Sequence, residues 1–173
     1  MELSHVSHRS IPPFPPGVFP ALVTPFDQDE DVDESAFRGI LRNVIDDVDG
    51  LVHCGTNGEF PYLSVEEQKR LIEIAVEESR GKPVIAGTGA PSTRQVIELT
   101  KNAREVGASA CLVVTPYFLH PSDKGIYQHF YEIAKAADIP IILYNIPLFA
   151  TPISYDVVKR LSRKKNVVAM TAS

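Results

Sequence analysis

Six short apolar runs recur along the chain, and most of them are continuous rather than alternating. Continuous apolar runs are typical of strands that are covered on both faces, as in a parallel sheet. The runs begin roughly 26 to 33 residues apart, about the length of one strand–helix unit. They cover residues 18–26, 50–55, 83–89, 110–117, 140–147 and 166–170.

The segments between these runs have the three- and four-residue apolar spacing of amphipathic helices. Ser64 and Ser92 each precede a Glu or Gln by three residues, which is the spacing of a capping box at a helix start. Ser154 precedes the last of these apolar patterns, formed by Val157, Val158 and Leu161. The pattern therefore predicts helices around residues 36–48, 71–76, 96–103, 126–137 and 157–161.

The predicted order is five β/α units followed by a sixth strand. Two architectures fit it, a doubly wound sheet and a (β/α)8 barrel, and the pattern alone does not choose between them. Both place their chemistry at the carboxyl ends of the strands. The loops that follow the strands are therefore where site residues are expected.

Composition narrows the class of protein. The 173 residues are 44% hydrophobic and 23% charged with a net charge of -5, as in an ordinary globular domain, and no basic stripe suggests nucleic acid as a partner. No apolar run approaches the ~20 residues of a membrane span. Cys54 and Cys111 lie within apolar runs, which indicates buried thiols in a reducing compartment, with the cytoplasm as the expected location.

The first sixteen residues, MELSHVSHRSIPPFPP, contain no apolar core of a secretory signal. Their proline content predicts an extended, flexible leader over residues 1–16, followed by one domain over residues 17–173.

The stretch HCGTNGEF follows the second run. Gly55 and Gly58 permit a tight turn with exposed backbone N–H groups, and Thr56 and Asn57 place a hydroxyl and an amide at its tip. Convergent donors of this kind suit a carboxylate ligand. An ordinary glycine-rich turn without a ligand fits the same residues.

Other stretches give weaker signals. GTGAPS has Gly87 and Gly89 but Ser92 at the third glycine position of a dinucleotide fingerprint, so we reject a Rossmann cofactor site. Tyr117 and Tyr144 at strand ends are able to pass a proton, or simply to pack and form local hydrogen bonds. The five histidines have no metal-ligand spacing, so neither a metal nor another cofactor is expected.

Five stretches in order and spacing resemble the dihydrodipicolinate synthase / N-acetylneuraminate lyase family: FPALVTPF, GTNGEFPYLS, VIAGTGAPST, VVTPYF and ILYNIP. The resemblance runs from about residue 17 to the last residue. It implies a TIM barrel and a class I, pyruvate-dependent aldolase or lyase that works as a homo-oligomer, a dimer or tetramer, on a small 2-oxo acid.

The resemblance also implies roles for individual residues. Thr56 matches the family's relay threonine and Tyr144 its proton-donating tyrosine. Gly55, Asn57 and Tyr117 match substrate-binding positions, with the Asn57 backbone in the carboxylate seat. The family's strand six carries a lysine that forms a Schiff base, and the protonated imine serves as an electron sink for the adjacent C–C bond.

Three positions depart from the family pattern. Phe118 stands where the family usually has a second relay tyrosine. Phe149 stands where the synthase branch usually has an arginine, which disfavours lysine biosynthesis and favours an aldolase for a less acidic 2-oxo acid, such as a 2-keto-3-deoxy sugar acid or 4-hydroxy-2-oxoglutarate. Thr171 in NVVAMTAS stands at the lysine position, and threonine has no amine.

These departures lead to the expectation of an incomplete TIM-barrel domain, with about six strands and five helices instead of the about 250 residues of a complete barrel. We expect this C-terminally truncated chain to be inactive as a lyase because Thr171 cannot form an imine. The alternatives are a non-catalytic 2-oxo-acid-binding or subunit-interaction fragment and, less favoured, a doubly wound nucleotide-binding protein.

Overall fold

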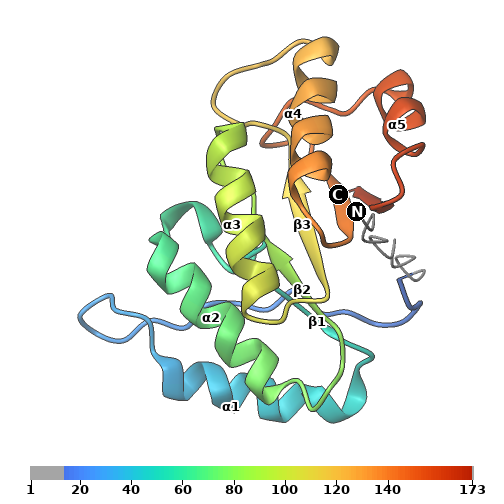
Figure 1. Cartoon of the computed structure of the whole chain (residues 1–173). Helices are drawn as coiled ribbons and strands as arrows, with labels where there is room; N and C mark the ends of the chain where they lie inside the picture. The colour runs from blue at the N-terminus through green and yellow to red at the C-terminus, as the bar shows by residue number, and fades with distance from the viewer. Residues whose placement is uncertain (1–13, 173) are drawn as a thin grey trace, which may run out of the picture.

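The computed structural model describes residues 14–172 (Figure 1), so most of the predicted leader lies outside the described residues. The described part contains one sheet and five α-helices. Its strands are β1 (Leu51–His53), β2 (Val84–Gly87), β3 (Ala110–Val114), β4 (Ile141–Asn145) and β5 (Val167–Ala172). Its helices are α1 (Glu34–Val44), α2 (Val65–Glu78), α3 (Thr93–Glu105), α4 (Asp123–Ala136) and α5 (Tyr155–Leu161), with 3-10 turns η1 (Ile45–Asp47) and η2 (Phe60–Tyr62).

The strands are all parallel and lie side by side in sequence order, β1 to β5. Neighbouring helices pack on each other in the same order, α1 on α2 through α4 on α5. A doubly wound sheet reverses its strand order and carries helices on both faces. Unreversed order with one helical layer is therefore the arrangement of an incomplete TIM barrel, and the doubly wound alternative is wrong.

Among the described residues, five of the six predicted strands form. The run 18–26 lies beside β1 but makes only a single parallel bridge, between Ala21 and Val52. The Leu22 amide donates to the Val52 carbonyl at 2.9 Å, and the Val52 amide donates to the Pro20 carbonyl at 3.1 Å. Pro20 has no N–H for a further ladder bond on one side of the bridge, and on the other side β1 ends at His53, because Cys54 adopts a left-handed φ of 56°.

Alternation along each strand directs the buried side chains to the two faces of the sheet. One face packs against the helices and forms the main core, which includes Phe37, Leu41, Leu71, Phe130 and Leu143, each almost fully buried. The other face points toward the barrel interior. There Ile85, Ala110 and Ile142 form a smaller cluster, against which Phe14 and Phe19 pack.

The helix starts follow the predicted capping. The Ser64 amide donates to the Glu67 carboxylate at 2.7 Å, and the Glu67 amide donates back to the Ser64 hydroxyl at 3.2 Å, which completes a capping box. Ser92 and Ser154 also cap their helices, α3 and α5. Within residues 14–172, no helix combines the length and the apolar content needed to cross a bilayer.

Candidate functional site

The turn after β1 has an unusual backbone. Cys54 and Glu59 both adopt left-handed φ angles, 56° and 55°, although neither is glycine. Between them the Gly58 amide donates to the Gly55 carbonyl at 3.1 Å. The Thr24 hydroxyl donates to the Gly58 carbonyl at 2.6 Å and fastens the turn to the preceding segment. Strained backbone that is fixed in this way often occurs at functional sites.

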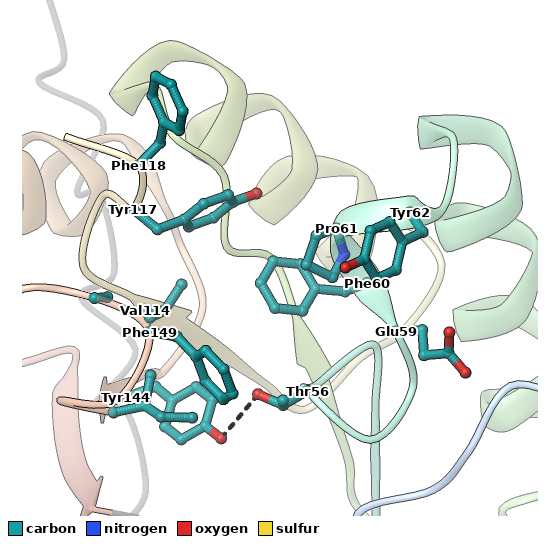
Figure 2. A pocket seen from close by; sticks show the side chains of 12 residues that line it. Thr56, Glu59, Phe60, Pro61, Tyr62, Val114, Tyr117, Phe118, Tyr144 and Phe149 are labelled. Carbon is teal, nitrogen blue, oxygen red and sulfur yellow. Dashed lines mark hydrogen bonds between the residues drawn. The ribbon is translucent and has the colours of Figure 1, made fainter.

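The turn brings Thr56 to Tyr144 of β4. The Thr56 and Tyr144 hydroxyl oxygens are 3.1 Å apart, across 88 residues of sequence. Figure 2 shows this hydrogen bond as a dashed line at the mouth of the strands. Either hydroxyl is able to donate, so the pair is able to pass a proton in either direction.

A cavity of about 350 Å³ opens beside this pair. Tyr117 lies across it from Tyr144 (Figure 2), with its ring edge-on to Phe60 at a centroid distance of 5.9 Å. Partial burial raises the pKa of the Tyr117 phenol above its usual range. The structure therefore brings three of the predicted site residues, Thr56, Tyr117 and Tyr144, to one cavity.

The other two turn residues lie differently. Gly55 is buried in the turn, and Asn57 is exposed, with its side-chain amide donating to the Ala21 carbonyl at 3.4 Å. Neither residue lines the cavity. The Asn57 side chain is thus engaged with the segment before β1, and the carboxylate seat predicted for the turn backbone stays a prediction.

Thr171 lies beside Tyr144. The two residues are partners in the register of β4 and β5, and both line a second cavity of about 400 Å³ in the barrel interior. Tyr144 lines both cavities, so residue 171 is in the neighbourhood of the hydroxyl pair. No lysine is among the described residues that line either cavity. Lys164 lies elsewhere, with its ammonium 4.2 Å from the centre of the Tyr131 ring on α4.

Sequence reasoning missed most of the cavity wall. Phe60 and Tyr62 come from η2, Val114 from the end of β3, and Ile146 and Ala150 from the loop after β4. The signal in the sequence that could have indicated these wall residues is the presence of apolar residues in the loops that follow the strands. Phe118 and Phe149 also line the cavity, and Phe118 has a left-handed φ of 75° with its ring 90% exposed.

Comparison with known proteins gives consistent matches. The family model described as "Dihydrodipicolinate synthetase family" matches residues 15–173. The 4-hydroxy-tetrahydrodipicolinate synthase of Methanothrix thermoacetophila is 45% identical over 159 residues, which cover 89% of this chain and 52% of that protein. The chain thus spans about half the length of the relatives it matches.

Solved structures agree with the fold. Dihydrodipicolinate synthase from Aquifex aeolicus superposes with a TM-score of 0.87 at 42% identity, over 91% of this chain and 55% of that one. The chloride-inhibited enzyme from Acinetobacter baumannii, solved in complex with pyruvate, gives a TM-score of 0.88 at 39% identity, over 91% and 55% of the two chains.

Proposed function

The chain belongs to the dihydrodipicolinate synthetase family, and we propose that its site at the carboxyl ends of the strands binds a small 2-oxo acid of the pyruvate type. With an amine at residue 171, the reaction class of this site would be that of a Schiff-base lyase or aldolase. The observation that supports the proposal most directly is the hydroxyl pair of Thr56 and Tyr144, 3.1 Å apart beside a cavity. A relative with a superposable fold was solved with pyruvate bound.

Each group at the site has a chemical task in this proposal. The oxo carbon of the ligand lies near residue 171, where an amine would convert it to an imine that accepts electrons from the neighbouring C–C bond. In that reaction Tyr144 and Thr56 would move the proton that the bond change requires. Backbone N–H groups of the turn at Gly55 and Asn57 receive the carboxylate, and Tyr117 contacts the ligand from across the cavity.

Thr171 determines what this chain does with the ligand. A hydroxyl does not form an imine with a ketone, so the chain binds the 2-oxo acid without covalent capture and does not act as a lyase. The relatives are named as synthases, whereas in a form with an amine at residue 171 Phe149, in the loop after β4, would favour an aldolase for a different second substrate. Both alternatives share the same 2-oxo acid.

Reductive trapping tests this proposal. The chain is incubated with pyruvate and borohydride, digested, and its peptides are weighed by mass spectrometry. We expect no adduct above the background of surface lysines in the natural sequence. In Thr171→Lys we expect an adduct on residue 171, because that side chain lines the same cavity as Tyr144.

Ala172→Lys is the matched control. Successive strand residues point to opposite faces, so residue 172 directs its side chain away from residue 171, and we expect background labelling only. An adduct on the natural chain contradicts the non-covalent proposal. Equal labelling of the two lysine variants, or of neither, contradicts the position assigned to the oxo carbon.

A second candidate function is association with other subunits, and β5 is the observation that favours it. Among the described residues, β5 pairs only with β4 and lies at the edge of the sheet. Its residues from Ala169 to Ala172 are exposed. An edge strand of this kind is a template for pairing with another polypeptide.

The two buried free thiols, Cys54 and Cys111, are compatible with the cytoplasm as the location.

A further inference from the structure

The wall of the cavity beside Thr56 and Tyr144 is strongly apolar. Its sides are formed by the rings of Phe60, Tyr117 and Phe149 and by the aliphatic groups of Val114, Ile146 and Ala150. Val114, Ile146 and Ala150 are buried and form a small cluster of their own, with Phe60, Tyr117 and Tyr144 packed against it. Figure 2 shows the rings of Phe60, Tyr117 and Phe149 around one opening. The cavity therefore offers apolar surface on several sides.

The polar side chains that line this cavity are the hydroxyl-bearing Thr56, Tyr62, Tyr117 and Tyr144 and the acidic Glu59. The hydroxyls of Thr56 and Tyr144 lie together and already bond to each other. Among the described residues that line the cavity, Glu59 is the single acidic residue, and lysine, arginine and histidine are absent. An anionic ligand group would lose its hydration there without a cation to replace it. It would also face a like charge.

We propose that this cavity binds an apolar, uncharged group at the distal end of the 2-oxo acid. Aromatic rings and branched aliphatic chains are the chemical class that fits. The volume of about 350 Å³ is at the lower end of the range of small-molecule sites, sufficient for one ring and a short linker. The proposal deepens the proposed function and depends on it, because the hydroxyl pair marks where the reacting end lies.

Phe149 is the residue that this proposal identifies as setting the preference. Its ring lines the cavity close to Tyr144 (Figure 2), yet it is 60% exposed. A substitution there is therefore compatible with folding. Leu148 precedes it, is 80% exposed and does not line the cavity, which makes it the matched control.

Isothermal titration of this chain with four compounds tests the proposal. Pyruvate has the 2-oxo acid head alone, 2-oxoglutarate adds a distal carboxylate, 2-oxo-4-phenylbutyrate adds a distal ring, and benzaldehyde supplies the ring without the acid head. We expect the phenyl compound to bind roughly tenfold or more tightly than 2-oxoglutarate, because the ring leaves water for an apolar wall.

The variants sharpen the result. Phe149→Arg is expected to weaken the phenyl compound and strengthen 2-oxoglutarate, each by roughly tenfold, since a guanidinium pairs with the distal carboxylate. Leu148→Arg adds the same charge one residue away and is expected to leave the order of affinities unchanged. The same shift in both variants would show a general charge effect and would overturn the assignment of Phe149.

The four compounds separate failure of this proposal from failure of the proposed function. If pyruvate binds but the distal ring gives no advantage over the distal carboxylate, the apolar subsite is wrong and the 2-oxo acid site stands. If benzaldehyde binds and pyruvate does not, the apolar cavity stands without a 2-oxo acid site. If none of the four binds, both proposals are wrong.

Discussion

His53, the last residue of β1, is expected to make the stability of this fold depend on pH. Its side chain is fully buried against Phe37, with 4.4 Å between the ring centres. Neither ring nitrogen has a hydrogen-bond partner among the described residues. Burial lowers the pKa of His53 from 6.5 to about 4. The imidazole is therefore neutral in the folded chain at neutral pH.

The size and sign of the effect follow from the two pKa values. One unit corresponds to about 1.36 kcal/mol, so a pKa lowered from 6.5 to about 4 corresponds to roughly 3 kcal/mol. The unfolded chain takes up the proton first as the pH falls. Stability is thus highest above pH 6.5 and decreases between pH 6.5 and about 4. Since a small domain is stable by about 5–15 kcal/mol, this loss is a large share.

His129 on α4 contributes in the same direction. Its ring is buried, which lowers its pKa to about 4, and its Nδ1 lies 2.9 Å from the Thr93 hydroxyl. Two imidazoles of similar pKa titrate over the same window. Removing either one is therefore expected to remove about half of the pH dependence between pH 6.5 and 4.5, and removing both to abolish most of it.

Urea unfolding at several pH values measures this effect. The chain has no tryptophan, so unfolding is followed by far-UV circular dichroism, from pH 7.5 to 4.5, for the natural chain, His53→Leu, His129→Leu and the double variant. At pH 7.5, His53→Leu is expected to change the unfolding free energy by about 1 kcal/mol or less, because an unpaired buried polar ring is replaced by an apolar group. A His53→Leu variant that keeps the full pH dependence of the natural chain would refute the reasoning.

Two further predictions concern the site turn and the sheet edge. Gly87→Ala is expected to destabilise the fold by roughly 1–3 kcal/mol in urea unfolding, because its methyl group would overlap the Cys54 carbonyl behind the turn. Gly39→Ala in α1 is the control, because its methyl group meets open space, and it is expected to stabilise the fold by about 0.5–1 kcal/mol. If both variants were destabilised alike, the close approach of Gly87 to the Cys54 carbonyl would not be the cause. The exposed edge at β5 predicts a molar mass that rises with concentration in sedimentation velocity, reduced in Met170→Lys; a monomer at every concentration would exclude association through β5.

The sequence predicted most of the helices and strands because their signals are local. Ser64 and Ser154 mark helix starts through side-chain bonds to amides three residues on, and these bonds are present. Continuous apolar runs predicted buried parallel strands. Five of the six runs formed parallel strands, and four of these are mostly buried, whereas β5 is exposed from Ala169 to Ala172. The run 18–26 formed a single bridge because periodicity counts apolar residues, whereas a ladder also needs the N–H group that Pro20 lacks and a longer partner than β1, which ends at His53.

The residues of the candidate site also fall into those that the sequence indicated and those that only the structure revealed. The family resemblance pointed to Thr56 and Tyr144, yet neither residue alone carried a signal that distinguished a proton relay from ordinary packing. Their hydrogen bond depends on two strand ends meeting across 88 residues. Phe60 and Ile146 were missed as wall residues because no local pattern tells which loop residues turn toward a shared cavity.

What the sequence determined by itself are the local choices: where helices begin, which segments are apolar on both faces, and that residue 171 is a threonine without an amine. Tertiary structure alone decided the unreversed order of the strands, the shared cavity beside Thr56 and Tyr144, and the burial of His53 without a partner. The physical reason is distance along the chain. Capping and periodicity act within one or two helical turns, whereas a cavity and a shifted pKa depend on every segment that packs around them.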